Sequence, residues 1–435
     1  MLALDSSTVV LRIPVRNPTR SLFTAINTCC YHSGRSGPSF FVGPTPSLNS
    51  IKMQLPRLKV EAEISGEDFF NASTSKRIPR HLVIMVNGIT GRLCLWGTLV
   101  TVKCAWFSSA SDWRYAAEQF VKRLPDKVIV HRSECNSSRL TFDGVDTMGE
   151  RLAEEVLSVV RRWPEVHKIS FVAHSLGGLV ARYAIGRLYD NSSKLEHVGN
   201  SRNHFKEEKT EYSKQCLTQS YEAKIAGLEP MNFITFATPH LGSRGNKQLP
   251  LLCGLPFLER RASQTAHLVA GRSGKHLFLM DSDGGKPPLL LRMVDDSDDL
   301  KFISALHAFK RRVAYANANF DQMVGWRTSS IRRQNELPKS NLIVNDEKYP
   351  HIVYVEGENT RGIYNKASSN VGGQTVDLEE KMIRGLTQVS WERVDVSFQT
   401  SKQRYIAHTT IQVKSYWLNS DGADVVYHMI DNFHL

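Results

Sequence analysis

The sequence lacks the cysteine spacing of a metal-binding or disulfide-stabilised protein. Its cysteines are seven in number, none of them in a Cys-x-x-Cys pair: Cys29, Cys30, Cys94, Cys104, Cys135, Cys216 and Cys253. Structural zinc sites and disulfide frameworks both need paired cysteines at characteristic spacings. We therefore expect neither a metal site nor a disulfide framework, and we expect no cofactor. The cysteines fit a reducing compartment best.

The sequence also lacks an apolar segment of the length that crosses a membrane. The apolar block LCLWGTLVTVKCAWF covers residues 93–107 and contains Lys103. A membrane-spanning helix needs about 20 predominantly apolar residues. We therefore expect no transmembrane segment.

Acidic residues are almost absent from the first 50 residues. Asp5 stands there among several arginines and many serines and threonines, with no apolar core of secretory-signal length. Organelle transit peptides and disordered N-termini share this composition. We expect residues 1–78 to be an N-terminal extension of one of these kinds, with folded sequence from Pro79. A transit peptide would place the protein in the chloroplast or another organelle, and otherwise we expect it in the cytoplasm.

Aromatic residues are not interleaved with the basic residues, as single-stranded nucleic-acid binding would require. The formal net charge is +12, and the basic pairs stand far apart in the sequence: Arg260-Arg261, Arg311-Arg312 and Arg332-Arg333. We expect these pairs to lie on a solvated surface, and we expect no nucleic-acid partner. A basic surface favours transient contact with anionic lipid headgroups.

Short apolar runs alternate with segments in which apolar residues have helical spacing. The expected strands are 81–88, 127–133, 168–174, 232–240, 311–321 and 391–398, and the expected helices are 112–124, 142–163, 176–188, 300–309 and 423–435. This alternation predicts an α/β fold with a mostly parallel central sheet and helices on both faces. A polar, charged stretch at about 190–229 predicts a mobile insertion.

One serine stands between a predicted strand and a predicted helix, in FVAHSLGGLVARYAIGRL. Ala173 and Gly177 give Ser175 small neighbours, as the tight turn of a nucleophile elbow requires. The Leu176 amide at the helix start can help to hold an oxyanion. A serine before a helix is often only an N-cap, but the strand before this one and the helix after it favour a nucleophile.

A nucleophilic serine needs a histidine base and an acid, and with this elbow the acid and then the histidine follow the serine. Asp321 ends the predicted strand 311–321, so we expect it at the carboxyl edge of the sheet. His408, in RYIAHTTIQVK, follows the predicted strand 391–398 and is the expected base. The alternatives are Asp281, Asp283 and the aspartates of 295–299, which we expect in surface loops, and four histidines: His174 and His428 with packing roles, His434 at the C-terminus, and His240 with a structural or pocket-shaping role.

Five segments together resemble the serine esterase, lipase-like family of α/β-hydrolases, in particular its plant members. They are HLVIMVNGITG, AHSLGGLVARYAIGRLY, FATPHLGSRG, NFDQMVGWRTSSI and AHTTIQVK, and the similarity covers about residues 79–435. The resemblance implies an α/β-hydrolase fold in which Ser175 is the nucleophile, Asp321 the acid and His408 the base.

The resemblance also implies that the Ile89 amide is the second oxyanion donor. Lipases usually carry histidine where this chain has Asn87, but a backbone donor does not depend on that side chain. The implied activity is hydrolysis of carboxylic esters, with lipid or acyl esters as substrates. An acyltransferase and a catalytically impaired binding protein on the same fold are the alternatives.

The apolar block interrupts the oxyanion loop. Removing 92–108 leaves VNGITGSASDW, which is similar to the uninterrupted family sequence. The block is either a lipid-facing lid or an intron-like insertion that impairs activity, and the clean rejoining of the motif favours the insertion.

Overall fold

The computed structural model describes most of the chain beyond residue 78. The described residues are 79–89, 91–92, 105–106, 108–190, 223–244, 270–339, 346–356 and 374–435, with Phe69–Phe70 before them. They belong to a single compact unit, residues 59–435. Four predicted features lie mainly outside the described residues: the N-terminal extension, the centre of the apolar block, most of the second insertion and the Arg260-Arg261 pair.

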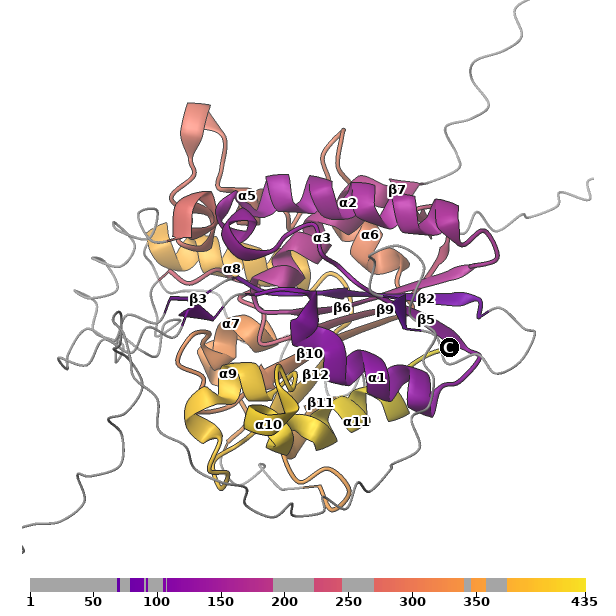
Figure 1. Ribbon diagram of the computed structural model, residues 1–435. Coiled ribbons are helices and arrows are strands. Elements are labelled where there is room, and N and C mark those ends of the chain that lie inside the picture. Colours follow the sequence, from indigo (N-terminus) through magenta and orange to yellow (C-terminus); the bar gives the residue numbers. More distant parts are fainter. Residues whose placement is uncertain are drawn as a thin grey trace, which may run out of the picture. The chain divides into compact units, whose positions relative to one another are not determined.

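One eight-stranded sheet forms the centre of this unit (Figure 1). Its spatial order is β1 (Phe69–Phe70), β5 (Val128–Arg132), β2 (His81–Val86), β6 (Lys168–His174), β9 (Glu229–Phe236), β10 (Arg311–Asn317), β12 (Glu392–Val396) and β11 (Ile352–Glu356). The inner strands are parallel to one another, and the edge strands β1 and β11 are antiparallel to their neighbours. Strand β2 is buried along its whole length because both faces of the sheet are covered.

Helices cover the two faces of the sheet (Figure 1). One face carries α2 (Val145–Arg162), α3 (Leu176–Leu188), α5 (Leu289–Arg292), α6 (Phe302–Ala308) and α8 (Gln374–Leu386), and the other carries α1 (Arg114–Arg123) and α11 (Ala423–Asp431). Alternate residues of β2 enter two separate cores, Leu82 and Ile84 with α2 and α3, and Val83 and Met85 with α1 and α11. The chain thus has the α/β-hydrolase fold that the sequence predicts.

The strand order changes direction beside β2. The chain passes from β2 through α1 to β5 on one side, and then returns through α2 to β6 on the other side. Ligands of α/β proteins bind at the carboxyl ends of strands flanking such a switch point. The loops that follow β2 and β6 begin there, and they carry Asn87, Ile89 and Ser175.

Several predicted boundaries are wrong. The strand predicted at 311–321 ends at Asn317, because its last pairing is with Val396, at the end of β12. Strand β9 begins at Glu229 and ends at Phe236, so it starts and ends earlier than the strand predicted at 232–240. The start of the predicted second insertion, β7 (Tyr189–Asp190), pairs with β8 (Lys224–Ile225) near its end.

The folded sequence begins before its predicted start, and the described helices are too short or too polar to span a membrane. Strand β1 pairs with β5, so the sheet includes residues before the predicted start at Pro79. No helix in the described ranges is both long enough and apolar enough to cross a bilayer.

Candidate active site

Ser175 occupies a strained turn between β6 and α3. Its backbone has φ 54° and ψ −129°, a conformation that residues other than glycine rarely adopt. The two glycines after it allow the close approach of neighbouring segments. A Cβ atom on Gly177 would lie 2.4 Å from the Asn87 carbonyl oxygen, and one on Gly178 would lie 2.2 Å from Thr238 Oγ1. The SLGG sequence therefore lets α3 begin directly against the loops after β2 and β9.

Ser175, His408 and Asp321 form a continuous hydrogen-bonded chain. His408 Nε2 lies 3.0 Å from Ser175 Oγ, and His408 Nδ1 lies 3.0 Å from Asp321 Oδ2. Because an ionised carboxylate only accepts, Nδ1–H donates to Asp321 and Nε2 accepts from the serine hydroxyl. The structure thus brings together the three side chains that chain order selected, in the arrangement of a nucleophile, its base and an orienting acid.

Asp321 is buried in a loop after β10 and is surrounded by hydrogen-bond donors. Its Oδ1 accepts from the backbone amides of Met323 and Val324, each at 2.9 Å, and its Oδ2 also accepts from Asn317 Nδ2 at 2.9 Å. Burial acts to raise the pKa of Asp321, but His408 and these donors outweigh it, so the pKa lies below its usual value. The carboxylate is therefore ionised at neutral pH.

His174 contacts the backbone of His408. Its Nε2 donates to the His408 carbonyl oxygen at 2.7 Å, and the two ring centroids are 4.7 Å apart. Burial and the nearby His408 keep the pKa of His174 well below its usual value, so the ring is neutral. The residue that we expected to pack beside the serine thus also fixes the short helix α9 (Ala407–Thr410), which carries His408.

The two predicted oxyanion amides belong to two segments that meet at Ser175, the start of α3 and the loop after β2. Leu176 is the first residue of α3, where backbone N–H groups have no acceptor within the helix. Ile89 follows Gly88, and a Cβ atom on Gly88 would lie 2.8 Å from Ser175 Cβ, so the loop after β2 runs directly past the serine. Neither amide donates to another backbone group in the described ranges.

A buried polar network holds the loop after β2. Asn87 Nδ2 donates to Ser108 Oγ at 2.9 Å and to the Asn136 carbonyl oxygen at 3.0 Å. Ser108 Oγ donates to the Gly88 carbonyl oxygen at 2.8 Å and lies 3.2 Å from Asp112 Oδ2. Ser108, which we placed at the end of the first insertion, is therefore part of the folded site.

Asp112 connects this network to the segment that follows His408. Its Oδ2 lies 3.0 Å from Lys414 Nζ, and both side chains are largely buried. The sequence does not predict this pair, because the two residues are far apart in the chain and no local pattern connects Asp112 to Lys414, the last residue of AHTTIQVK. The pair ties the oxyanion loop to the histidine segment.

We expect Lys414→Met to make folding stability strongly pH-dependent. Burial raises the pKa of Asp112, while the charge of Lys414 acts to lower it. Without Lys414 the folded-state pKa rises further above the unfolded value of about 3.9. The folded state then binds more protons than the unfolded state between these two values, so stability falls as pH rises through that window. Thermal unfolding against pH should show the variant's melting temperature dropping increasingly below wild type above about pH 4.

The matched control is the double variant Asp112→Asn with Lys414→Met. It has no buried carboxyl to titrate at this position, so its melting temperature should differ from wild type by an amount independent of pH. A pH-independent deficit in Lys414→Met alone would contradict the assigned pairing.

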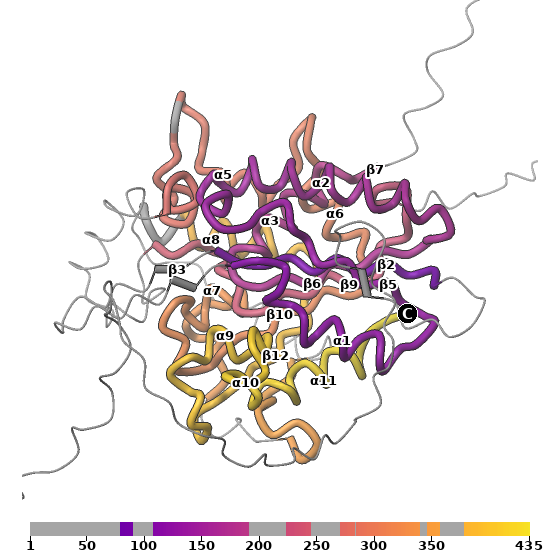
Figure 2. The backbone as a smooth tube through the Cα atoms, viewed as in Figure 1, coloured from indigo at the N-terminus to yellow at the C-terminus, as the bar shows by residue number. Residues whose placement is uncertain are grey.

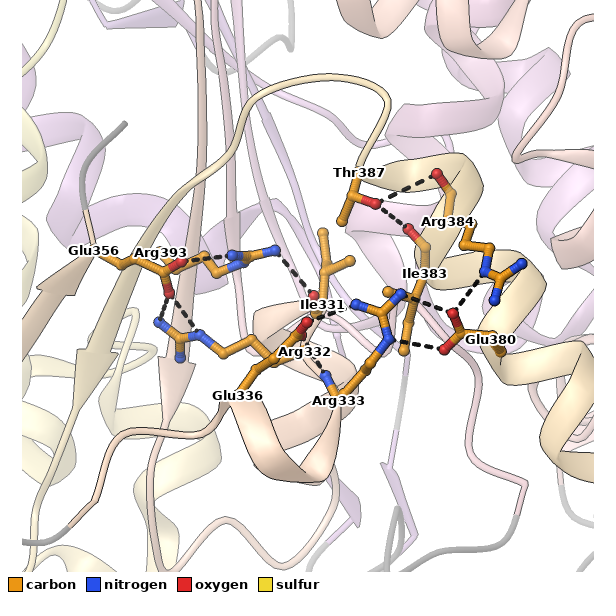
Figure 3. Close-up of polar contacts among 10 residues, drawn as sticks. All are labelled: Ile331, Arg332, Arg333, Glu336, Glu356, Glu380, Ile383, Arg384, Thr387 and Arg393. Atoms are coloured by element: carbon orange, nitrogen blue, oxygen red, sulfur yellow. Dashed lines mark hydrogen bonds and ion pairs between the residues drawn. The ribbon is translucent and has the colours of Figure 1, made fainter. Parts of the chain in front are cut away.

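The segment after Asp321 is held by buried ion pairs (Figure 3). Arg332 is fully buried, and its guanidinium donates to both oxygens of Asp395 at 2.8 Å and to Glu356 at 2.9 Å. Glu356 also accepts from Arg393, which in turn donates to the Ile331 carbonyl oxygen. Breaking a buried pair of this kind typically costs about 3–5 kcal/mol. The network therefore anchors helix α7 (Trp326–Ser330) and its neighbours to β11 and β12.

Two of the three basic pairs thus lie in polar networks rather than on the predicted solvated surface, and the third, Arg260-Arg261, lies outside the described residues. Arg311 and Arg312 are buried as well, the former against Glu392 at 2.7 Å and the latter against backbone carbonyls. Arg333 bridges Glu336 and Glu380 beside the Arg332 network (Figure 3). An Arg-Arg pair has the same local sequence pattern whether it is solvated or buried against acidic residues far away in the chain. The sequence therefore could not predict this burial.

The alternative acids and bases lie outside the hydrogen-bonded chain. Asp281 accepts from the Leu289 amide, Asp296 accepts from two amides at the start of α6, His428 contacts Tyr315 Oη, His240 contacts Thr235 Oγ1, and the His434 amide donates to Asn232. Within the described residues, no group of three or more His, Cys, Asp or Glu side chains is arranged to hold a metal ion.

Two curated yeast proteins illustrate what the chain is similar to. “Putative lipase ROG1” of Saccharomyces cerevisiae is 27% identical over 314 residues, which are 68% of this chain and 37% of that protein. “Putative lipase C4A8.10” of Schizosaccharomyces pombe is 24% identical over 259 residues, which are 58% of this chain and 26% of that protein. The chain thus spans well under half the length of these relatives.

Solved structures also match. An alpha/beta hydrolase superfamily protein from Enterococcus faecalis has a TM-score of 0.33 and 11% identity, covering 81% of this chain and 94% of that one. The mature form of Bacillus licheniformis lipase BlEst2 has a TM-score of 0.29 and 13% identity, covering 58% of this chain and 72% of that one.

The family described as “Putative serine esterase (DUF676)” matches residues 76–331. The match includes Ser175 and Asp321, and His408 lies beyond it. Because it covers more than half of the chain, this protein belongs to that serine esterase family.

Proposed function

We propose that the protein hydrolyses carboxylic esters, with lipid or acyl esters as its substrate class, through a Ser-His-Asp triad and an acyl-enzyme. The observation that supports this most is the pair of 3.0 Å contacts that link Ser175 to His408 and His408 to Asp321. Its lipase-named relatives favour an ester of lipid type.

In the first half-reaction His408 Nε2 takes the proton of Ser175 as Oγ attacks the ester carbonyl carbon. The resulting imidazolium lies against ionised Asp321, which stabilises its charge and keeps Nδ1 protonated. Collapse of the tetrahedral intermediate breaks the bond to the alcohol, which takes the proton from His408 Nε2. The acyl group remains on Ser175.

In the second half-reaction water replaces the alcohol. His408 Nε2 takes a proton from the water as the water oxygen attacks the acyl carbonyl carbon. The tetrahedral intermediate then collapses, His408 gives this proton to Ser175 Oγ, and the free acid is released. In both halves the amides of Ile89 and Leu176 stabilise the oxyanion. One such donor is typically worth on the order of a hundredfold or more in rate, so the position of the loop after β2 matters.

Esterase activity on a panel of soluble and lipid esters tests this function. We expect turnover of carboxylic esters, with none of amides or phosphodiesters of similar shape. Product analysis with an added alcohol separates hydrolysis from acyl transfer, since a transferase would form the new ester in place of free acid. An absence of turnover across all ester classes would contradict the proposal.

We further propose that the apolar block is dispensable for the site. Its two ends lie side by side, because β3 (Gly91–Arg92) pairs antiparallel with β4 (Ala105–Trp106). Deleting 92–107 rejoins the chain there and keeps Ser108, which contacts Asn87 and Gly88. We expect this deletion to raise kcat/KM for soluble and long-chain esters.

The matched control for this deletion also removes Ser108. Loss of its two hydrogen bonds to Asn87 and Gly88 loosens the loop after β2, so the longer deletion should be less active than the shorter one. If the shorter deletion instead lowers activity on long-chain lipid esters alone, the block is a lid and the proposal fails.

A further inference from the structure

Exposed aromatic side chains lie in the same two segments of the chain as Asp321 and His408. Every exposed phenylalanine, tyrosine or tryptophan in the described part of the chain belongs to one of two segments, and these residues are Phe320 (39% exposed), Tyr405 (61%), Tyr416 (56%) and Trp417 (86%). Phe320 immediately precedes Asp321, and Tyr405 lies in the turn that leads into the helix of His408. We call these four residues the aromatic rim.

Arg404 joins the two segments of the rim. Its guanidinium lies 5.6 Å from the ring centroid of Phe320 and 4.9 Å from that of Tyr405, and these two rings are 6.1 Å apart in an edge-to-face arrangement. Phe320 has φ 57°, which a bulky residue adopts only at a cost in free energy. The rim therefore includes two aromatic rings from distant parts of the sequence, and one of them, Phe320, is exposed on a strained backbone.

Helix α10 (Tyr416–Asn419) extends the rim next to α9, as Figures 1 and 2 both show. Its inner side is anchored, because Asn419 Nδ2 donates to the hydroxyls of Thr409 and Thr410. Tyr416 stacks on Tyr115 of α1 at 4.9 Å. Trp417, between these two anchors, is left almost entirely in solvent.

The charges near the rim are mixed, with a basic excess. Lys402 is exposed, Arg404 and Asp421 are both partly exposed, and Asp421 accepts a hydrogen bond from the Ser401 hydroxyl, so these three residues leave one excess positive charge. Tyrosine, tryptophan and arginine carry an apolar body and a polar end, and such side chains are favoured at the level of lipid headgroups. Exposed aromatic clusters of this kind mark interaction surfaces rather than ordinary solvent-facing positions.

We propose that the aromatic rim docks on a lipid surface containing anionic headgroups and holds the segments of Asp321 and His408 against it. This inference rests on the proposed function, because it assigns the ester substrate to a lipid layer. A lipid layer bound at the rim would present its own esters near Asp321 and His408, because Phe320 precedes Asp321 and Tyr405 lies three residues before His408. The chain's net charge of +12 favours the same occupant.

Vesicle binding by Ser175→Ala protein tests the rim separately from catalysis. The vesicles are phosphatidylcholine with about one part in five phosphatidylserine, and binding is measured by co-flotation. We expect Trp417→Ser in this background to weaken binding by about tenfold, since a tryptophan supplies a large apolar area to such an interface. The matched control is Leu157→Ser on α2, which is 39% exposed on the opposite face of the sheet and should bind as the parent does.

Two additional readouts make the outcome decisive. Vesicles should shift the tryptophan emission of the parent to shorter wavelength, and this shift should be much smaller in Trp417→Phe. Equal flotation of Trp417→Ser and its parent would overturn the proposal, as would a Trp417-dependent dimer in sedimentation that does not bind vesicles. Hydrolysis of a soluble ester by protein with Ser175 intact reports on the proposed function alone.

Discussion

Replacing Ser175 by alanine is expected to lower kcat for a soluble ester by on the order of a millionfold, the loss typical of removing a nucleophile from such a triad. The hydroxyl is the atom that would form the acyl-enzyme, and no other described side chain contacts His408 Nε2 in a position to replace it. Folding should be retained, because the strained turn depends on Gly177 and Gly178 rather than on the hydroxyl.

The matched control is Ser170→Ala on strand β6, which leads into the turn of Ser175. Ser170 is also fully buried, but its hydroxyl bonds His81 and Asn232, away from the site. This variant should lose thermal stability and keep kcat. Comparable kcat values for Ser175→Ala and wild type would show that another residue performs the reaction.

Asp321→Asn should lower kcat by about ten-thousandfold. The asparagine oxygen can still accept from the Met323 and Val324 amides, which places its NH₂ group toward His408 Nδ1. That group donates to Nδ1, so the ring proton moves to Nε2, where it prevents acceptance of the serine proton. The measurement is steady-state kinetics, in which kcat should fall far more than KM rises.

Asp281→Asn is the control for the acid. Asp281 is another aspartate after the serine in chain order, but its carboxylate accepts from the Leu289 amide and lies outside the hydrogen-bonded chain. It should leave kcat at the wild-type level. A large loss in Asp281→Asn, with little loss in Asp321→Asn, would reverse the assignment of the acid.

Local sequence patterns are enough to predict the turn around Ser175 and the alternation of strands and helices. The strand, small residue, serine and glycine pair around Ser175 predict an elbow, because each requirement is met within a few residues. Chain order then selects Asp321 and His408, which the structure holds in contact through two hydrogen bonds. The apolar alternation between strands and helices likewise predicts a sheet covered on both faces.

Features that depend on distant partners could not be predicted in the same way. Strand β10 ends at Asn317 because its partner ends there, so Asp321 lies in a loop rather than on the strand. The burial of Arg332 requires Asp395, and that of Asp112 requires Lys414, each far away in the chain. The antiparallel edge strand β11 and helix α8 are absent from the elements that the sequence predicts.

Mapping the adduct of a fluorophosphonate probe tests the central claim most directly. The probe phosphonylates a serine only where a base activates it, and mass spectrometry of a tryptic digest identifies the residue. We expect a single adduct, on Ser175 in the peptide of residues 169–182, strongly reduced in His408→Asn. An adduct on another serine, or equal labelling of Ser175→Ala, would contradict the assignment of Ser175 as the nucleophile.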